Sequence, residues 1–409
     1  MAQDNREKVV VVGAGHGGGS VVACLRQYGY TGDIELIGME PVVPYHRPPL
    51  SKAWMKGETS TQALALKPEA FYATENIALR LGTRVARIDA ARCCVVLDDG
   101  AEVVYDQLVL APGADARSLP MPGAAFGNVL SLRNLNDAAG LRAALTPGKK
   151  LVIIGGGYVG LECAATARSL GVEVVLVERA PRLLERVASA AISTFLQSYH
   201  QSRGVVIVTA ADLLAIDGAA RAEGIRLKDG RSFACDALLV GVGANPSVAL
   251  AQEAGLACDD GILVDADCRS SQANIFALGD AAKRPHEVYG RALRLESVPS
   301  ALEQAKRVAA VLTGREPAAA EVPWFWSDQY DLKLQMAGLL FEATQSVVRG
   351  DPEHSKFAVY HLCAGRVVAV EAVNSPQDFM AGKKMIANKT VVDATRLADT
   401  AVALKDLLA

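Results

Sequence analysis

The sequence lacks the features that mark several large protein classes. Its most apolar run, residues 151–161, is interrupted by glycines and is far shorter than the ~18 apolar residues that a membrane-spanning helix needs. Residues 1–8 are polar and show no apolar core of a signal peptide. The formal net charge is only −3, and no basic amphipathic stretch is present. We therefore expect neither a nucleic acid nor a membrane as a partner.

Cysteine pairs at metal-binding or redox spacing are also lacking. The eight cysteines include no Cys-x-x-Cys pair, and Cys93 directly precedes Cys94. This pattern favours neither a metal site nor a disulfide framework, so we predict no bound metal. Reduced thiols are typical of the cytoplasm, which is the expected compartment.

The chain contains two copies of one strand–turn–helix–strand unit. With 409 residues and 51% hydrophobic residues, it is long enough for two or three domains. A β-branched run at residues 9–12 precedes a glycine turn, a helical stretch to about residue 28 and a second strand at residues 34–37. The same order recurs with strands at residues 151–154 and 172–177. Strands that alternate with helices predict doubly wound parallel sheets.

Each unit carries a Gly-x-Gly-x-x-Gly turn directly after its first strand. In this motif the first glycine permits the tight turn, the second lets a pyrophosphate approach the backbone, and the third allows close packing of helix on strand. Free N–H groups at the start of the helix then meet the phosphates. The glycines are Gly13, Gly15 and Gly18 in the first turn, and Gly155, Gly157 and Gly160 in the second.

An acidic residue ends the second strand of each unit, where a carboxylate accepts a hydrogen bond from a ribose hydroxyl. These residues are Glu40 and Glu178. Glu178 would repel the 2′-phosphate of NADPH, so NADH is the expected substrate, although Arg179 and Arg182 follow closely and partly offset that repulsion. A glycine turn without a ligand is the alternative for either motif alone, but two complete units indicate two dinucleotide sites.

Beyond these units the sequence changes character. Short strands with turn signals occur at residues 95–97 and 225–227. From Pro323 onward, alternating strands at residues 346–349, 357–362 and 366–373 precede polar helical segments. The predicted fold class is α/β, with two Rossmann-like dinucleotide-binding domains and a C-terminal α+β domain.

Several further motifs resemble one family. Residues 44–52, which read Pro-Tyr-His-Arg-Pro-Pro-Leu-Ser-Lys, are similar to the flavin-contacting loop of NADH-dependent ferredoxin reductases from oxygenase systems, within the glutathione-reductase-like FAD flavoproteins. Matches also occur at residues 132–135, 275–280 and 323–329. The resemblance covers nearly the whole chain. It implies FAD in the first turn and NADH in the second, an order that spacing alone leaves open.

The resemblance also implies a domain order and a partner. Residues 1–112 and 244–325 would form the FAD-binding domain, 113–243 the NADH-binding domain and 326–409 the interface domain. The electron acceptor would be an acidic 2Fe-2S ferredoxin that serves a terminal oxygenase. Trp324 and Trp326 are candidates for covering the flavin edge where the acceptor would dock, with core packing as the alternative. A basic cluster at Lys383, Lys384 and Lys389 would steer the docking, with a solvated helix face as the alternative. The chain would be a monomer or a homodimer.

Family motifs supply the remaining site predictions. Lys52, Glu162 and Trp326 are the candidate catalytic residues, with Lys52 paired to Glu162. A surface lysine and a helix-surface carboxylate are the alternatives for that pair. The predicted FAD contacts are Gly13, Gly15, Gly18, Glu40, Arg47, Lys52, Val85, Ala111, Gly113, Arg117, Arg133, Gly279, Asp280, Val298 and Trp326. The predicted NADH contacts are Gly155, Gly157, Tyr158, Gly160, Glu162, Glu178, Gly241 and Gly243.

Two departures from the family pattern stand out. Family members often have Ala-Thr-Gly where this chain has Ala111, Pro112 and Gly113, and many carry tryptophan where Val298 stands. Pro299 suits the first turn of a helix, and the resemblance implies that this helix directs its positive end at the flavin.

The absence of a thiol relay indicates how electrons leave. Disulfide reductases of this architecture use a Cys-x4-Cys pair, and coenzyme A disulfide reductases use one cysteine soon after the second strand; neither pattern occurs here. Electrons must then leave from the flavin itself. A rubredoxin reductase, an NADH oxidase and a redox-responsive interaction flavoprotein like apoptosis-inducing factor remain as alternatives.

Overall fold

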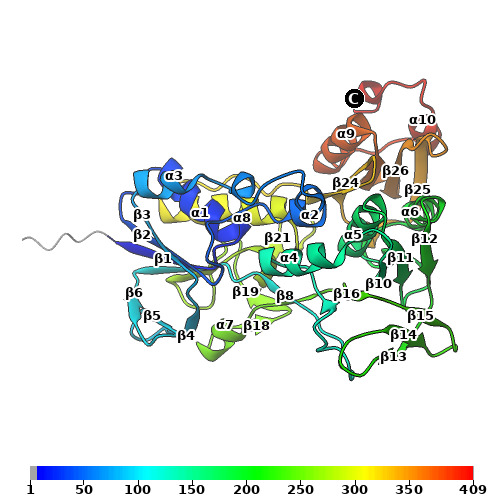
Figure 1. Ribbon diagram of the computed structural model, residues 1–409. Helices are drawn as coiled ribbons and strands as arrows, with labels where there is room; N and C mark the ends of the chain where they lie inside the picture. Colours follow the sequence, from blue (N-terminus) through cyan, green and yellow to red (C-terminus); the bar gives the residue numbers. More distant parts are fainter. Residues whose placement is uncertain (1–6, 409) are drawn as a thin grey trace, which may run out of the picture. The chain divides into compact units, whose positions relative to one another are not determined.

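The computed structural model describes residues 7–408, which fall into two compact units (Figure 1). Unit 1 combines the segments Met1–Arg47, Thr61–Asp115 and Asn245–Glu321. Unit 2 combines Pro48–Ser60, Ala116–Ala244 and Val322–Ala409. The boundaries of the four segments predicted above are not tested by this division and stay predictions.

A parallel sheet forms the centre of unit 1. Its strand order is β20 (Ile275–Ala277), β7 (Gln107–Leu110), β1 (Lys8–Val12), β2 (Asp33–Gly38) and β3 (Ile77–Leu81). The β1 valines are almost completely buried, as expected for a strand covered on both faces. This burial fixes the turn that follows β1 at the carboxyl edge of the sheet, where ligands bind in doubly wound folds.

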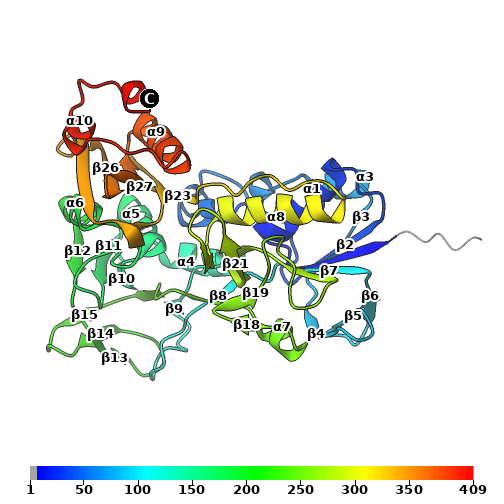
Figure 2. The same ribbon diagram turned by 180° about the vertical axis from the view of Figure 1, so that it is seen from behind.

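Two helices pack against each other beside this sheet. They are α1 (His16–Gln27) and α8 (Val298–Leu312), and Figure 2 shows them side by side. Ser297 caps the start of α8, since its hydroxyl accepts from the backbone N–H of Ser300, and Pro299 occupies the first turn of the helix. Just after β20, the Gly279 N–H donates to the side-chain oxygen of Gln304 on α8 at 2.8 Å.

Smaller elements complete unit 1. An antiparallel meander comprises β4 (Val85–Asp89), β5 (Cys94–Leu97) and β6 (Glu102–Val104). A mixed sheet comprises β18 (Cys258–Asp259), β19 (Gly261–Leu263), β21 (Ala282–His286) and β22 (Arg291–Leu293). The short helices are α3 (Glu69–Thr74), α7 (Ala249–Glu253), η2 (Gln62–Leu64) and η3 (Gly279–Ala281). Two of the crossings of the chain between the units fall within β8 (Ala114–Ala116) and β17 (Ala244–Pro246).

Unit 2 repeats the parallel sheet. The strand order is β12 (Val205–Val208), β11 (Glu173–Val177), β10 (Lys150–Ile154), β16 (Ala237–Val240) and β9 (Val129–Leu130). A meander comprises β13 (Leu213–Asp217), β14 (Gly224–Leu227) and β15 (Ser232–Ala234). The helices that accompany them are α4 (Leu135–Ala144), α5 (Tyr158–Ser169), α6 (Ala190–Ser202), η1 (Pro48–Ser51) and α2 (Ala53–Lys56).

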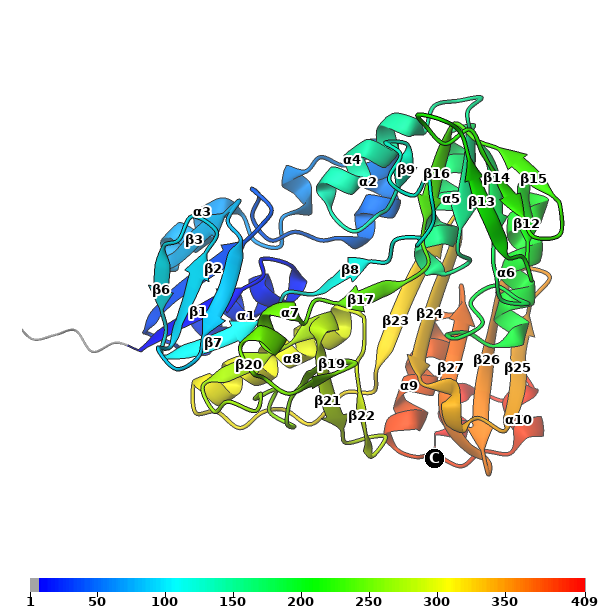
Figure 3. The ribbon, with the colours of Figure 1, turned by 90° about the horizontal axis from the view of Figure 1, so that it is seen from below.

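The end of the chain adds an antiparallel sheet to unit 2, seen clearly in Figure 3. Its order is β23 (Trp324–Gln329), β24 (Leu332–Gly338), β27 (Arg366–Val373), β26 (Lys356–Cys363) and β25 (Gln345–Asp351). Helix α9 (Pro376–Ala387) packs on β27 and β24. The last elements are α10 (Ala394–Ala398), η4 (Leu340–Glu342) and η5 (Leu404–Leu407).

Candidate functional site

The first glycine turn is shaped by the packing of its outer glycines. Gly13 has φ +110°, and a Cβ there would overlap the carbonyl oxygen of Ala111; a Cβ on Gly18 would overlap the carbonyl oxygen of Gly13. Gly15 is different, because a Cβ there would come no closer than 3.8 Å to any neighbour, the nearest being the Arg47 guanidinium. Protein packing therefore explains Gly13 and Gly18 but leaves the backbone at Gly15 open to a ligand.

The second glycine turn follows the same pattern. A Cβ on Gly155 would overlap the carbonyl oxygen of Gly241, and one on Gly160 would overlap the carbonyl oxygen of Gly155. At Gly157, the residue before α5, a Cβ would have no neighbour within 4 Å. Packing within the protein thus does not require glycine at the middle position of either turn, whereas close approach of a pyrophosphate to the backbone would require it.

Both predicted ribose-binding carboxylates are held in place by donors of their own unit. Glu40 accepts from the Tyr45 hydroxyl at 2.6 Å and from the Arg47 guanidinium at 2.7 Å. Glu178 accepts from the backbone N–H of Gly156 at 2.6 Å and that of Ala180 at 2.7 Å. Glu178 is therefore bound to its glycine turn, through Gly156, whereas Glu40 is held by two side chains of the loop that follows it.

Two histidines that were not among the predicted site residues lie at the first glycine turn. The ring nitrogens of His16 and His46 are 3.4 Å apart, and the rings meet edge to face. Burial, followed by the charges of His46 and Arg47, lowers the pKa of His16 to about 4, while Asp280 opposes the shift. The influence of Asp280 and Arg47 on His16 indicates that these predicted FAD contacts gather at the same turn.

Lys52 and Glu162 form a buried ion pair within unit 2. The Lys52 ammonium lies 2.7 Å from Glu162 Oε2, with 18% of the lysine side chain and 7% of the glutamate side chain exposed. The Ser51 hydroxyl donates to the same oxygen at 2.6 Å, and the Ser327 hydroxyl donates to Oε1 at 2.6 Å. Both serines were missed by the sequence predictions, although they stand in the motifs that include Lys52 and Trp326.

The loop that carries Lys52 is fixed to α5 over one helical turn. Thr166, four residues after Glu162, donates its hydroxyl to the Ser51 carbonyl oxygen at 2.7 Å in a buried contact. Residues four apart share one face of a helix, so Glu162 and Thr166 together hold the segment 51–52. Glu162 therefore lies on α5, the helix that opens at the second glycine turn, and Lys52 belongs to the segment that is held against this helix.

Strand β23 presents two different faces. Trp324 and Trp326 lie on one face with their rings 5.6 Å apart, and the Lys383 ammonium lies 5.5 Å from the Trp324 ring. Because side chains alternate along a strand, Phe325, Ser327 and Gln329 occupy the other face. Phe325 contacts the ring of Tyr158 at 4.8 Å, and Ser327 reaches Glu162.

The remaining predicted residues occupy defined positions within each unit. In unit 1, Val85 and Ala111 belong to the hydrophobic core, Gly113 and Gly279 have positive φ, Asp280 lies in η3, and Val298 is the first residue of α8. In unit 2, the Arg117 N–H donates to the Gly243 carbonyl oxygen, Gly241 donates to Ile154, and Arg133 donates its N–H to Asp137. Lys52, Arg117, Arg133 and Trp326 belong to unit 2, unlike the other predicted FAD contacts.

The cysteines offer no redox pair. All eight are free, and burial raises the pKa of the Cys163 and Cys24 thiols, which disfavours the reactive thiolate. Within residues 7–408, no group of histidine, cysteine and acidic side chains is arranged to hold a metal ion.

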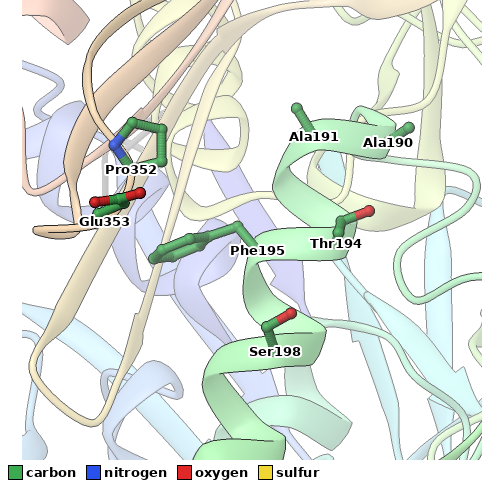
Figure 4. Close-up of a pocket in the computed structure, with 7 residues that line it drawn as sticks. All are labelled: Ala190, Ala191, Thr194, Phe195, Ser198, Pro352 and Glu353. Carbon is green, nitrogen blue, oxygen red and sulfur yellow. The ribbon is translucent and has the colours of Figure 1, made fainter.

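A hollow of about 560 Å³ lies elsewhere in unit 2. Figure 4 shows Phe195 of α6 directed toward Pro352 and Glu353 of the β25–β26 turn. None of the residues predicted to bind a nucleotide lines this hollow, so we assign it to neither dinucleotide. Across the described part of the chain, no helix combines the length and apolarity needed to cross a membrane.

Comparison with known proteins agrees with this arrangement. Residues 7–305 match the family described as pyridine nucleotide-disulphide oxidoreductase, and residues 324–408 match the family described as reductase C-terminal. A probable ferredoxin reductase of Castellaniella defragrans is 45% identical over 97% of both chains. Putidaredoxin reductase of Pseudomonas putida is 40% identical over 100% of this chain and 97% of its own.

A solved structure extends the likeness to the fold. The crystal structure of the covalent putidaredoxin reductase–putidaredoxin complex superposes with a TM-score of 0.96 at 39% identity, over 98% of both chains. The predicted α/β class is confirmed, as are the oxidoreductase class and, through the family, FAD and NADH as cofactors. The chain belongs to the pyridine nucleotide-disulphide oxidoreductase family and, within it, to the ferredoxin reductases that carry a reductase C-terminal domain.

Proposed function

We propose that this chain oxidises NADH and passes the electrons singly, through FAD, to a 2Fe-2S ferredoxin that serves an oxygenase. The observation that carries the proposal is the buried ion pair between Lys52 and Glu162, a residue of the helix at the second dinucleotide turn, in a chain whose eight cysteines form no pair. The ferredoxin-reductase names of its relatives support the same acceptor class. We further propose that the chain works in the cytoplasm, as a monomer or a homodimer.

The residues of both turns fit a dinucleotide. The open backbone at Gly15 and Gly157 leaves room for a pyrophosphate, and Arg47 beside Gly15 supplies a positive charge for it. Glu40 and Glu178 would accept from ribose hydroxyls. Bound FAD would take two electrons from NADH and release them one at a time, as a ferredoxin requires.

The protein's own contribution is to position the nicotinamide. Glu162 is held by three donors, so its carboxylate has one orientation, and it holds the Lys52 ammonium in turn. A pair fixed in this way supplies a rigid, largely water-free wall against which the nicotinamide is aligned for transfer to FAD. Lys52→Ala is expected to slow FAD reduction by NADH while FAD stays bound. A normal anaerobic stopped-flow reduction rate in that variant would remove Lys52 from the site.

The acceptor would dock on the tryptophan face of β23. Lys383 lies over the Trp324 ring, so this lysine and the aromatic face belong to one surface of unit 2. Lys384 is the next residue of α9, and Lys389 follows shortly after the end of that helix. A positive surface of this kind steers an acidic ferredoxin and raises its association rate at low salt.

Charge reversal tests this docking surface. The double variant Lys383→Glu, Lys384→Glu is expected to raise the KM for a 2Fe-2S ferredoxin and to weaken its salt dependence, with FAD reduction by NADH unchanged. Lys356→Glu, an exposed lysine at the β25–β26 hairpin, is the matched control. Equal ferredoxin KM values and equal salt dependence in all three proteins would reject the surface.

Turnover with three acceptors tests the function itself. The purified FAD-containing protein is assayed with NADH and a 2Fe-2S ferredoxin, a rubredoxin or oxygen alone. The proposal predicts that the ferredoxin gives the highest kcat/KM. Faster rubredoxin reduction would indicate a rubredoxin reductase, and turnover that needs only oxygen would indicate an NADH oxidase. Negligible turnover with every acceptor would favour the redox-responsive interaction protein.

A further inference from the structure

A chain of buried hydrogen bonds extends from Glu162 across unit 2. Beyond Ser327, the side-chain amide of Gln329 donates to the Ser327 hydroxyl oxygen at 3.1 Å. The other end of that amide, Gln329 Oε1, lies 2.8 Å from Nε2 of His200 on α6. Ser327 and His200 are fully buried, and Gln329 is 1% exposed.

The Glu162 carboxylate determines which group is the donor in every hydrogen bond of this series. Glu162 as a carboxylate only accepts, so the Ser327 hydroxyl gives its single proton to Glu162. Ser327 must then accept from the Gln329 NH₂ group, which turns Gln329 Oε1 toward His200. His200 therefore carries its proton on Nε2, and burial lowers its pKa to about 4, so the ring is neutral at pH 7.

All the donors thus point the same way, toward Glu162. Hydrogen bonds aligned head to tail polarise one another, and those that end on an anion are the strong ones. The primary amide in the middle makes the chain a poor proton wire, because relaying a proton through it would need the unstable imidic tautomer of the amide. A purely orienting role fits both the amide and the neutral imidazole.

We propose that Ser327, Gln329 and His200 are positioning residues that fix the Glu162 carboxylate for the NADH half-reaction. The inference rests on the proposed function, because Glu162 is taken there as the wall of the nicotinamide site. It adds that residues of β23 and α6, which lie far from Glu162 in sequence, set the rate of FAD reduction without touching the nucleotide.

The role is specific to one face of β23. Ser327 and Gln329 alternate with Trp324 and Trp326, so the strand separates the orienting chain from the proposed docking surface. Substitutions on the Ser327 face are therefore expected to change FAD reduction by NADH, whereas those on the tryptophan face are expected to change ferredoxin turnover.

The test measures FAD reduction by NADH in an anaerobic stopped flow, using the full-length, FAD-loaded protein. Ser327→Ala is expected to lower the limiting rate constant by about tenfold, the typical cost of losing one hydrogen bond to a charged group. The NADH concentration at half-maximal rate should change little, since the nucleotide contacts remain. Ser327→Thr keeps the hydroxyl and should restore the rate to about that of the unaltered protein.

Matched variants separate positioning from general packing. Ser193, another buried serine of unit 2, donates to the Leu183 carbonyl oxygen and takes no part in the hydrogen-bond chain to Glu162. Ser193→Ala should therefore leave the rate constant of FAD reduction unchanged. At the far end, His200→Leu removes the donor to Gln329 and should slow reduction, whereas His200→Gln keeps an N–H donor and should not. If Ser327→Ala fails to fold, the His200 pair gives the same comparison.

The outcomes distinguish this inference from the proposed function. Ser327→Ala and His200→Leu proteins that reduce FAD as fast as the unaltered protein would overturn the orienting chain alone. A loss that Ser327→Thr and His200→Gln do not restore, or that Ser193→Ala shares, would also overturn it, since packing would then explain the loss. An unaltered protein whose FAD is not reduced by NADH would reject the proposed function itself.

Discussion

Removing the charge of Lys52 or of Glu162 alone should lower the free energy of unfolding, and removing both charges together should largely restore it. The two charged atoms are 2.7 Å apart, and most of each side chain is buried. At an effective dielectric constant of about 20, the attraction at this distance is about 6 kcal/mol, and desolvation offsets part of it. We expect a net coupling free energy of about 2–3 kcal/mol between the two residues.

A double-mutant cycle measures this coupling. Glu162→Gln keeps the shape and one acceptor oxygen but leaves the Lys52 ammonium without its counter-charge, and Lys52→Met does the reverse. The double variant removes both charges, so its free energy of unfolding should exceed the value expected from adding the two single effects. Urea unfolding followed by circular dichroism supplies the four free energies.

A coupling below about 1 kcal/mol would refute the reasoning, because that is the range of solvent-exposed ion pairs. The same four proteins should be compared for FAD reduction by NADH. All three variants are expected to be slow, since recovery of stability does not restore the charges that align the nicotinamide.

Three further predictions follow from single residues. Replacing Glu178 by Gln removes the charge that would repel a 2′-phosphate, so the ratio of kcat/KM for NADPH to that for NADH should rise about tenfold or more; an unchanged ratio would count against the assignment. Gly157→Ala meets no neighbour within 4 Å and should leave the melting temperature unchanged while raising the KM for NADH, whereas an unchanged KM would show that no nucleotide approaches there. His200 has a pKa of about 4 in the folded chain and about 6.5 when unfolded, so the free energy of unfolding should fall by about 3 kcal/mol between pH 6.5 and pH 4. In urea unfolding, His200→Gln should flatten that part of the pH profile. An equal slope in both proteins would contradict the low pKa of the buried His200.

The local parts of both nucleotide sites were predictable from the sequence. The β-branched runs at residues 9–12 and 151–154 became β1 and β10, and each glycine turn lies between a buried strand and a helix as predicted. These features depend on neighbouring residues only, through burial of the strand and the conformational needs of glycine. The helix predicted near Pro299 also begins there, as α8.

The contacts that orient Glu162 were not predictable in the same way. Ser51 and Ser327 are 111 and 165 residues away from it in sequence, so no local pattern records that they meet its carboxylate. Alternation along residues 324–329 indicates that Ser327 and Gln329 share a face. It does not tell which helix covers that face, because this depends on how a separate sheet packs.

Anaerobic titration of the FAD-containing protein tests the central claim most directly. One equivalent of NADH should bleach the flavin absorbance, and the reduced protein should then reduce two equivalents of a one-electron 2Fe-2S ferredoxin while its count of free thiols stays constant. A flavin that stays oxidised under NADH, or reducing equivalents that appear as new thiols instead of reduced ferredoxin, would contradict the account.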